Sequence, residues 1–115
     1  MIFGALLAGG IGQRLGCGKP KQFLEICGKP ILVHSIEKFL EVDDVDKLII
    51  SSPPDYIDKT EELITEYFDN DSKLVVIAGG KERSDTILNS IRWALNNGAN
   101  EDSIMVTHDA ARIFV

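Results

Sequence analysis

Short apolar runs alternate with longer amphipathic stretches along this chain, and this alternation limits the possible folds more than any other feature. The short runs predict strands over residues 2–8, 46–52 and 73–80, and from residue 103 onward. Apolar side chains at helical spacing predict helices over residues 29–42, 53–68 and 82–98. Strands that alternate with helices favour a mostly parallel sheet with helices on both faces. We therefore predict an α/β protein with a three-layer α/β/α, Rossmann-like architecture.

Two expectations about these helices follow from particular residues. Pro30 is expected at the first helical position of the 29–42 helix, where its missing N–H is not needed. In the 82–98 helix the larger apolar side chains share one face, and Gly98 is expected to end the helix. That apolar face is made of Ile87, Leu88, Ile91 and Leu95.

Length and charge narrow the class of protein further. With 115 residues, 44% of them hydrophobic, the chain is predicted to form one domain over residues 1–115. The formal net charge of -6 argues against nucleic acid or an anionic membrane as a partner. No run is long enough for a membrane span or a secretory leader. Cys17 and Cys27 match no zinc or redox spacing, so we expect a cytoplasmic protein with reduced thiols.

The loop after the first strand is rich in glycine and carries only positive charge. It reads LLAGGIGQRLGCGKPKQF, with Arg14, Lys19 and Lys21 and no acidic residue. It is not a dinucleotide fingerprint, because Leu15 stands at the third glycine position, and not a P-loop, because Pro20 follows Gly18-Lys19. Exposed backbone N–H groups with Arg14 and Lys21 suit a phosphate group. The alternative is a surface loop whose cations only keep it solvated.

Three of the four predicted strands end in polar or glycine-rich segments. These are LAGGIGQR after the first strand, GGKERSDT after the third and HDAAR after the fourth. Ligands of open parallel sheets bind at the carboxyl ends of the strands. We therefore expect the three segments to converge on one crevice.

Taken together, these segments resemble one enzyme family. The order LAGGxGxRLGxxxPKQF, GGxxRxDT and THDAAR, over residues 2–114, is similar to that of the polyol-phosphate cytidylyltransferases. This family includes the 2-C-methyl-D-erythritol 4-phosphate enzymes of isoprenoid synthesis and the D-ribitol-5-phosphate enzymes of teichoic-acid synthesis. The resemblance implies a fold of the nucleotide-diphospho-sugar transferase type. It also implies transfer of CMP from CTP to a polyol phosphate, with release of pyrophosphate.

The resemblance assigns roles to individual positions. Arg14 and Lys21 match the catalytic cations that neutralise the CTP phosphates and stabilise the transition state. Asp109 matches an aspartate near the ribose and the magnesium ion, and is the possible metal ligand. The implied CTP-binding positions are Leu7, Ala8, Gly9, Gly10, Gly80, Lys81, Arg83, Thr86, Asp109 and Ala110.

The implied reaction suits this set of side chains. A phosphate oxygen of the polyol attacks the α-phosphorus of CTP in line, so no Ser, Cys or His nucleophile is needed. The protein has to bring two anions together and stabilise the charge that develops, with Mg²⁺ on the leaving phosphates.

Two departures from the family pattern qualify the resemblance. Ile113 stands where the family has a proline, and family members are about twice as long. We therefore expect the chain to be the amino-terminal, nucleotide-binding part of a longer cytidylyltransferase that forms a homodimer at full length.

The substrate stays open between several alternatives. The segments ISSPPDYIDKT and EDSIMVTHDA favour D-ribitol 5-phosphate, and the alternative is 2-C-methyl-D-erythritol 4-phosphate. A CTP-binding fragment without catalysis is a further alternative. So is a sugar-1-phosphate nucleotidyltransferase that uses UTP or GTP, although GGKERSDT and HDAAR argue against it.

Overall fold

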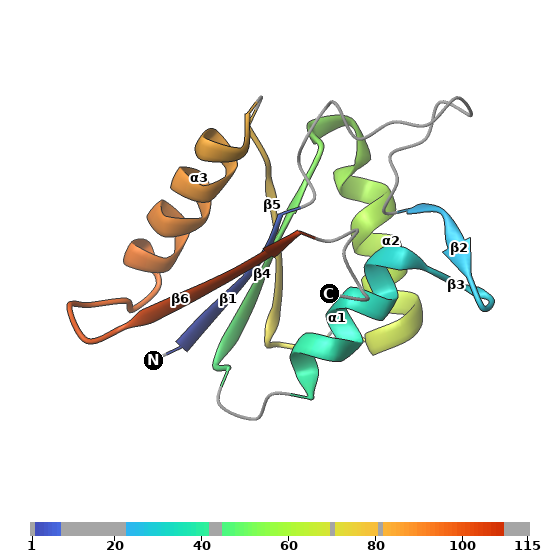
Figure 1. Ribbon diagram of the computed structural model, residues 1–115, viewed down its shortest axis with the longest axis horizontal. Coiled ribbons are helices and arrows are strands. Elements are labelled where there is room, and N and C mark those ends of the chain that lie inside the picture. Colours follow the sequence, from blue (N-terminus) through green and yellow to red (C-terminus); the bar gives the residue numbers. More distant parts are fainter. Residues whose placement is uncertain (1, 8–22, 42–44, 70, 81, 110–115) are drawn as a thin grey trace.

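A four-stranded parallel sheet forms the centre of the molecule (Figure 1). The computed structural model describes residues 2–7, 23–41, 45–69, 71–80 and 82–109, with His108 and Asp109 as backbone alone. The strands are β1 (Ile2–Leu7), β4 (Lys47–Ser52), β5 (Leu74–Ala78) and β6 (Ile104–Asp109). They lie in the order β5-β4-β1-β6, and every pairing between them is parallel. The first strand in the sequence, β1, is thus an inner strand of the sheet.

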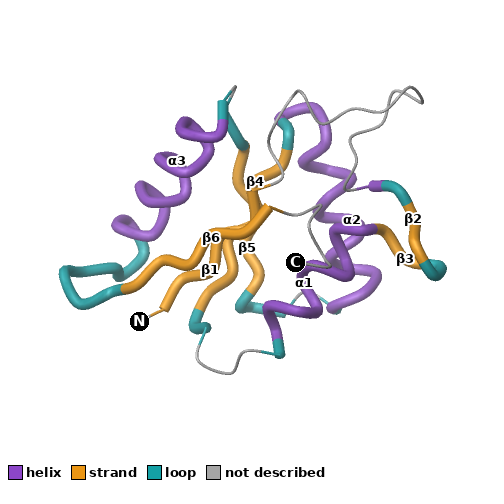
Figure 2. Tube along the Cα trace, in the orientation of Figure 1, coloured by secondary structure: helices purple, strands orange, loops and turns teal. Residues whose placement is uncertain are grey.

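Helices cover both faces of the sheet, as the alternation predicts. The helices α1 (Ile31–Leu40) and α2 (Ile57–Phe68) lie on one face, and α3 (Arg83–Asn96) lies on the other (Figure 2). A short 3-10 turn, η2 (Pro54–Tyr56), leads into α2. The predicted three-layer α/β/α architecture is therefore confirmed. None of the helices described is long and apolar enough to cross a membrane.

The larger part of the core lies between the sheet and the first two helices. Leu6, Leu48 and Ile50 of the sheet pack there with Leu32 and Ile36 of α1. Inner strands of a parallel sheet are buried on both faces, which explains why β1 and β4 are apolar along most of their length. Side chains of β4 and α1 fill the space above Gly4 at this face. A Cβ on Gly4 would lie 2.9 Å from Leu48 Cδ1 and 3.0 Å from Phe39 Cε1.

The other face of the sheet packs against small side chains of α3. Thr86, Ser90 and Ala94 are buried there, and the Ser90 hydroxyl lies 3.2 Å from that of Ser51 on β4. Three larger apolar residues point elsewhere, with Leu88 46%, Ile91 39% and Leu95 60% exposed, whereas Trp93 packs edge-on against Phe3 of β1. The apolar face noted in the sequence is therefore not the face that packs on the sheet. Small residues allow α3 to lie close to the strands, and the Ser51–Ser90 pair together with bonds to backbone carbonyls satisfies the hydroxyls buried there.

A two-stranded hairpin precedes α1, so the helix begins later than the sequence predicts. β2 (Glu25–Ile26) pairs antiparallel with β3 (Lys29–Pro30), so Pro30 is the N-cap of α1 and not its first helical residue. Cys27 and Gly28 form the turn with φ angles of 54° and 81°, as a type I′ turn requires. Cys17, the other cysteine, lies outside the described residues.

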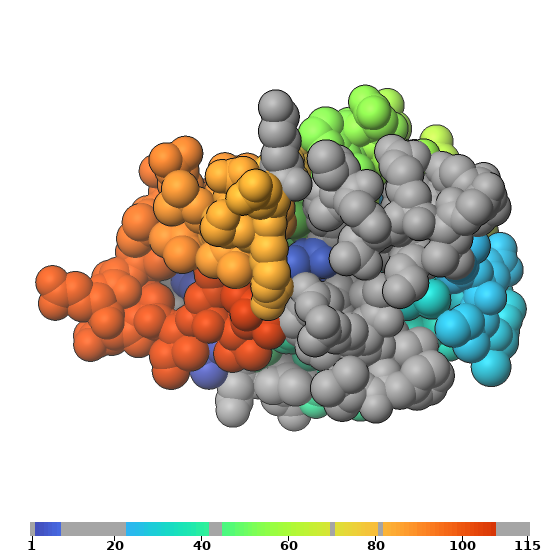
Figure 3. All heavy atoms as spheres, turned by 45° about the horizontal axis from the view of Figure 1, so that its top comes forward, coloured from blue at the N-terminus to red at the C-terminus, as the bar shows by residue number. Residues whose placement is uncertain are grey.

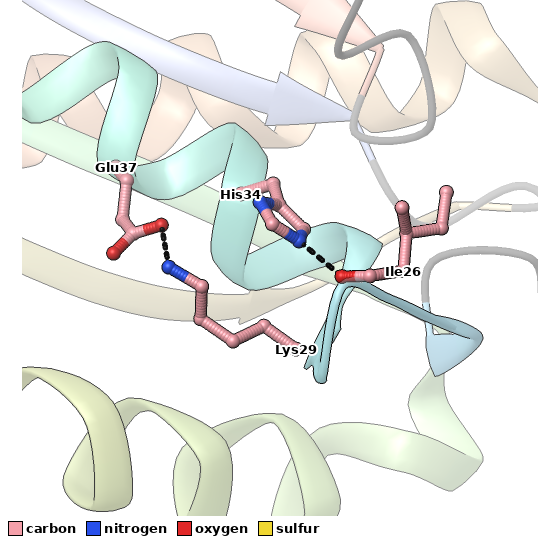
Figure 4. Close-up of polar contacts among 4 residues, drawn as sticks. All are labelled: Ile26, Lys29, His34 and Glu37. Carbon is pink, nitrogen blue, oxygen red and sulfur yellow. Dashed lines mark hydrogen bonds and ion pairs between the residues drawn. The ribbon is translucent and has the colours of Figure 1, made fainter.

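Two side-chain contacts fix the hairpin on α1 (Figure 4). The His34 ring donates from Nε2 to the Ile26 carbonyl oxygen at 2.6 Å. The Lys29 ammonium lies 2.7 Å from the Glu37 carboxylate. Both helical partners are on α1, so the hairpin is held to the helix at two points.

Candidate functional site

The carboxyl ends of the four strands share one edge of the sheet, and the strand order reverses there. The chain passes from β1 outward through β4 to β5, and then returns to the other side of β1 as β6. Ligands of open α/β sheets bind at such a reversal. Leu7 and Asp109, the last residues of β1 and β6, are direct partners in the register. In Figure 3, which turns this edge toward the viewer, the blue end of β1 is visible between α3 and the hairpin.

The described part of the chain contains five of the predicted site residues. Leu7 and Asp109 lie side by side at the reversal, whereas Gly80, Arg83 and Thr86 follow β5. β5 is two strands from β1, which corresponds to about 10 Å across the sheet. The structure therefore places both groups on the same edge but not in contact. The predicted positions outside the described residues are Ala8, Gly9, Gly10, Arg14, Lys21, Lys81 and Ala110.

A close approach of backbone and helix explains the glycine at position 80. A Cβ on Gly80 would lie 2.2 Å from the Cβ of Asp85, which no real pair of atoms tolerates. The preceding Gly79 donates its N–H to the Ser52 carbonyl at 2.8 Å, which continues the pairing of β5 with β4. The turn after β5 is therefore pressed against the start of α3 and attached to β4.

The first turn of α3 holds this segment through a capping box. Glu82 is the N-cap, and its N–H donates to the Asp85 carboxylate at 3.3 Å. Acidic side chains in a first helical turn also interact favourably with the helix dipole. The sequence identifies Asp85 only as a residue of this turn. The ExxD spacing before an apolar stretch is the signal that indicates the box.

Thr86 is the most buried of the described site side chains. It is 2% exposed, and its hydroxyl accepts the Gly80 N–H at 3.0 Å and donates to the Glu82 carbonyl at 3.2 Å. Arg83, by contrast, is exposed at the helix start. Among the described residues of this segment, Glu82, Arg83 and Asp85 are exposed, whereas the Thr86 hydroxyl is buried.

The described residues are compatible only with a metal site that has fewer than three protein ligands. Within 2–7, 23–41, 45–69, 71–80 and 82–109, no three His, Cys, Asp or Glu residues are grouped so that they could hold a metal ion. Magnesium in nucleotide sites is commonly bound by one or two carboxylates together with substrate phosphates. Asp109, the last residue of β6, stays the predicted carboxylate for such a site.

A pocket of about 300 Å³ lies elsewhere, between α2 and β5. Asp71 and Ser72, which precede β5, are part of its lining, so it lies toward the amino ends of the strands. Glu61 adds a second carboxylate. The lining of this pocket is acidic, and the pocket lies at the opposite edge of the sheet. It is therefore not suited to bind a triphosphate.

A family model gives the decisive comparison. The model of the 2-C-methyl-D-erythritol 4-phosphate cytidylyltransferase (IspD) family matches residues 2–115, which is almost the entire chain. The chain belongs to the IspD family.

Solved structures of IspD proteins agree with this assignment. A Francisella tularensis 2-C-methyl-D-erythritol 4-phosphate cytidylyltransferase is 26% identical, with a TM-score of 0.74 over 99% of this chain. A 4-diphosphocytidyl-2C-methyl-D-erythritol synthase is 27% identical, with a TM-score of 0.73 over 99%. The synthase of Anaerococcus prevotii, at 20% identity, shares the fold with a TM-score of 0.74 over 98% of this chain.

The IspD structures are longer than this chain. The matches cover 46%, 47% and 44% of those three proteins, respectively, so the chain spans a little under half of their length. The predicted resemblance to the amino-terminal part of a cytidylyltransferase is confirmed. The preference for the ribitol-phosphate branch is not supported, because the family model and all three structures carry the erythritol name.

Proposed function

We propose that this chain is the CTP-binding part of a cytidylyltransferase that acts on 2-C-methyl-D-erythritol 4-phosphate. One observation carries the proposal: the strands that precede the three family motifs end on the same edge of the parallel sheet. β5 and β6 are three strands apart, so a ligand that touches every motif extends over about 14 Å. A nucleoside triphosphate, with its base at one end and its phosphates at the other, has this elongated form.

The segments along this edge are assigned to different parts of CTP. The segment after β5, with Gly80, Lys81, Arg83 and Thr86, is assigned to the cytosine base. The segment after β1, with Leu7, Ala8, Gly9 and Gly10, is assigned to the rest of the nucleotide. Asp109 and Ala110 follow the strand next to β1 and are assigned to the ribose side.

The reaction is a displacement at phosphorus. A phosphate oxygen of the polyol phosphate forms a bond to the α-phosphorus of CTP, the bond from that phosphorus to the bridging oxygen breaks, and pyrophosphate leaves. Arg14 and Lys21 offset the negative charge that spreads over the phosphoryl oxygens in the transition state. Asp109 would hold a magnesium ion, which supplies further neutralisation on the leaving phosphates when it is bound. We also propose a homodimer for the full-length form, and a cytoplasmic location stays a prediction.

Binding and turnover of the purified chain test the proposal separately. Calorimetric titration with CTP and Mg²⁺ should show saturable binding that UTP and GTP do not match. Pyrophosphate release should then be faster with 2-C-methyl-D-erythritol 4-phosphate than with D-ribitol 5-phosphate. Binding of CTP without turnover on either substrate would favour a CTP-binding fragment. The absence of CTP binding would refute the assignment of the edge.

A further inference from the structure

We propose that the outer edge of β5, with the pocket beside it, is a docking site for a basic, extended peptide segment of a partner protein. The pocket lies toward the amino ends of the strands, away from the edge assigned to CTP. The inference therefore goes beyond the proposed function and does not depend on it. Two features carry it: backbone groups that face away from the sheet, and a pocket rimmed by carboxylates.

The backbone of β5 is paired with another described strand along one edge only. The sheet order is β5-β4-β1-β6, so β5 is an outer strand of the described sheet. Lys73 and Gly79 each bond to β4 through their backbone, at 2.8 Å. Backbone groups of successive residues alternate in direction along a strand. Val76 lies three residues from both, so its N–H and C=O point away from β4.

The protein itself already uses part of this outer edge. The Leu74 N–H donates to the Asp71 carbonyl at 3.0 Å, and the Asn89 amide lies 3.4 Å from the Ala78 carbonyl oxygen. Between these two points, no hydrogen bond described for Val76 uses its outward N–H or C=O. An antiparallel partner needs both groups on one residue, because a hydrogen-bonded pair exchanges two bonds. A peptide can therefore add to β5 as a further strand at Val76.

The pocket lies where a side chain of such an added strand would fall. Its volume is about 300 Å³, and Leu74 and Val76 of β5 line it together with Ile64 of α2. In a hydrogen-bonded antiparallel pair, the residue opposite Val76 has its side chain on the same face of the sheet. That side chain would enter the pocket, whereas the side chains of its two neighbours would point to the opposite face.

The lining of the pocket suits a side chain with an apolar stem and a positive charge. Ile64, Leu74 and Val76 supply apolar surface, and Glu61 and Asp71 supply two carboxylates. Lysine and arginine bury their methylene stems on apolar surface and keep the charge at a polar rim. A second copy of this chain suits the site less well, because its formal net charge is -6.

Neighbouring groups leave the rim negative. Asp71 Oδ1 accepts the Lys73 N–H at 2.9 Å, and the Lys47 ammonium donates to the Ser72 carbonyl at 2.8 Å. A carboxylate has several lone pairs, so Asp71 can accept a further donor. Neither Lys47 nor Lys73 is among the described lining residues. Both carboxylates of the rim are therefore available to a cation from outside.

Binding of short synthetic peptides tests the proposal. Capped Val-Lys-Val-Lys-Val should shift the amide signal of Val76 in two-dimensional NMR spectra, with saturation at up to about 1 mM peptide. The same peptide with both lysine nitrogens of the backbone methylated should bind about tenfold more weakly, because it cannot donate to the strand edge. Equal affinity of the two peptides would overturn strand addition. Capped Val-Glu-Val-Glu-Val should not bind, and equal binding of this peptide would overturn the charge argument.

Two double variants test the role of the pocket. Glu61→Gln with Asp71→Asn removes both rim charges and should weaken binding of the lysine peptide about tenfold. Glu62→Gln with Glu66→Gln is the matched control, because it removes two charges from the surface of α2 that do not line this pocket. In the control, the affinity should stay within about twofold of the original. Equal weakening in both variants would reduce the effect to general attraction of charge and refute the site.

The same NMR spectra also decide where the peptide binds. Saturable binding without a change at Val76 would place the peptide elsewhere and refute the docking site, as would the absence of binding. Because no measurement here uses CTP, failure of the proposed function leaves this test intact.

Discussion

Gly4 shows how closely the sheet and α1 approach each other at a single residue. The nearest atoms to a Cβ at this position belong to Leu48 and Phe39, which pack in the core on that face. Close-packed side chains cannot move freely to admit another methyl group. The residue type here is therefore set by space and not by backbone conformation.

We predict that Gly4→Ala lowers the free energy of unfolding by about 1–3 kcal/mol, because overpacking forces neighbouring side chains out of their preferred rotamers. Urea denaturation followed by circular dichroism measures the loss. Leu48→Val removes bulk near the new methyl group, so the double variant should lose less than the sum of the single losses. Strict additivity of the two losses would contradict the predicted contact.

The cationic loop carries the second residue-scale prediction. Arg14→Ala and Lys21→Ala should each reduce the rate of pyrophosphate release by about 10²-fold or more, because each removes a charge that stabilises the transition state. Lys19 lies in the same loop and serves as the control, since Lys19→Ala removes an equal charge without a family role. A rate close to that of the original protein in either of the first two variants would show that the loop is misassigned.

Sequence reasoning named candidate site residues but not the partners of their side chains. Gly80 and Thr86 are recognisable from the GGKERSDT segment, whereas the bond between them depends on how closely α3 approaches β5. That distance results from the small side chains Ser90 and Ala94 farther along the helix. No local pattern in the sequence encodes such a spacing, so the hydrogen bond between Gly80 and Thr86 becomes evident only in three dimensions.

The turn of the β2–β3 hairpin does not contain the residue pair that its turn type favours most. Cys27 has a φ of 54°, a left-handed conformation that a cysteine side chain disfavours. Asn-Gly is the preferred pair for a type I′ turn, because asparagine tolerates this conformation.

We predict that Cys27→Asn raises the free energy of unfolding by about 0.5 kcal/mol, because it relieves this left-handed strain. Chemical denaturation of the two proteins gives the difference. Cys27→Ser has a similar size and a weaker preference for a positive φ, so it should give no comparable gain. Equal stabilisation by serine and asparagine would argue against the conformational cause.

Periodicity located α3 but did not identify the face that packs on the sheet. The pattern of Leu88, Ile91 and Leu95 is regular, yet these residues are among the more exposed of the large apolar side chains described. The buried residues of α3 are Thr86, Ser90 and Ala94, and the Ser90 hydroxyl has its partner on β4. Apolar periodicity alone does not identify a helix face whose buried side chains carry hydroxyl groups.

At the scale of the whole molecule, apolar surface remains uncovered beside β6. Ile104 is 57% and Val106 46% exposed, and they lie two residues apart on the same face of the strand. Met105, between them, packs with Phe3 and Ile49 on the opposite face. β6 is also an outer strand of the described sheet, and exposed apolar outer strands favour association.

We predict that the chain self-associates at high concentration, and that Ile104→Lys with Val106→Lys suppresses this association. Static light scattering over a concentration series measures it, and the Tm should change little. Met105→Lys places the same charge on the packed face, and should instead lower the Tm by several degrees. Unchanged scattering in the double variant would exclude this face as the contact.

The overall architecture was predictable from the sequence because it depends on alternation alone. Four apolar runs and three amphipathic stretches leave few arrangements other than helices on both faces of a parallel sheet. The hairpin was not expected, because Lys29 and Pro30 read as the start of a helix and only the pairing with Glu25 and Ile26 makes them a strand.

The pairing of β1 with β6 also has a consequence for synthesis on the ribosome. Ile2 pairs with Ile104, so one edge of β1 has no partner strand until nearly all of the described chain has been translated. At 5–20 residues per second, that delay is roughly 5–20 s. During it, an apolar strand has a bare edge, which chaperones are suited to shield. The sheet edge at Leu7 and Asp109 is consequently among the last features of the nascent protein to form.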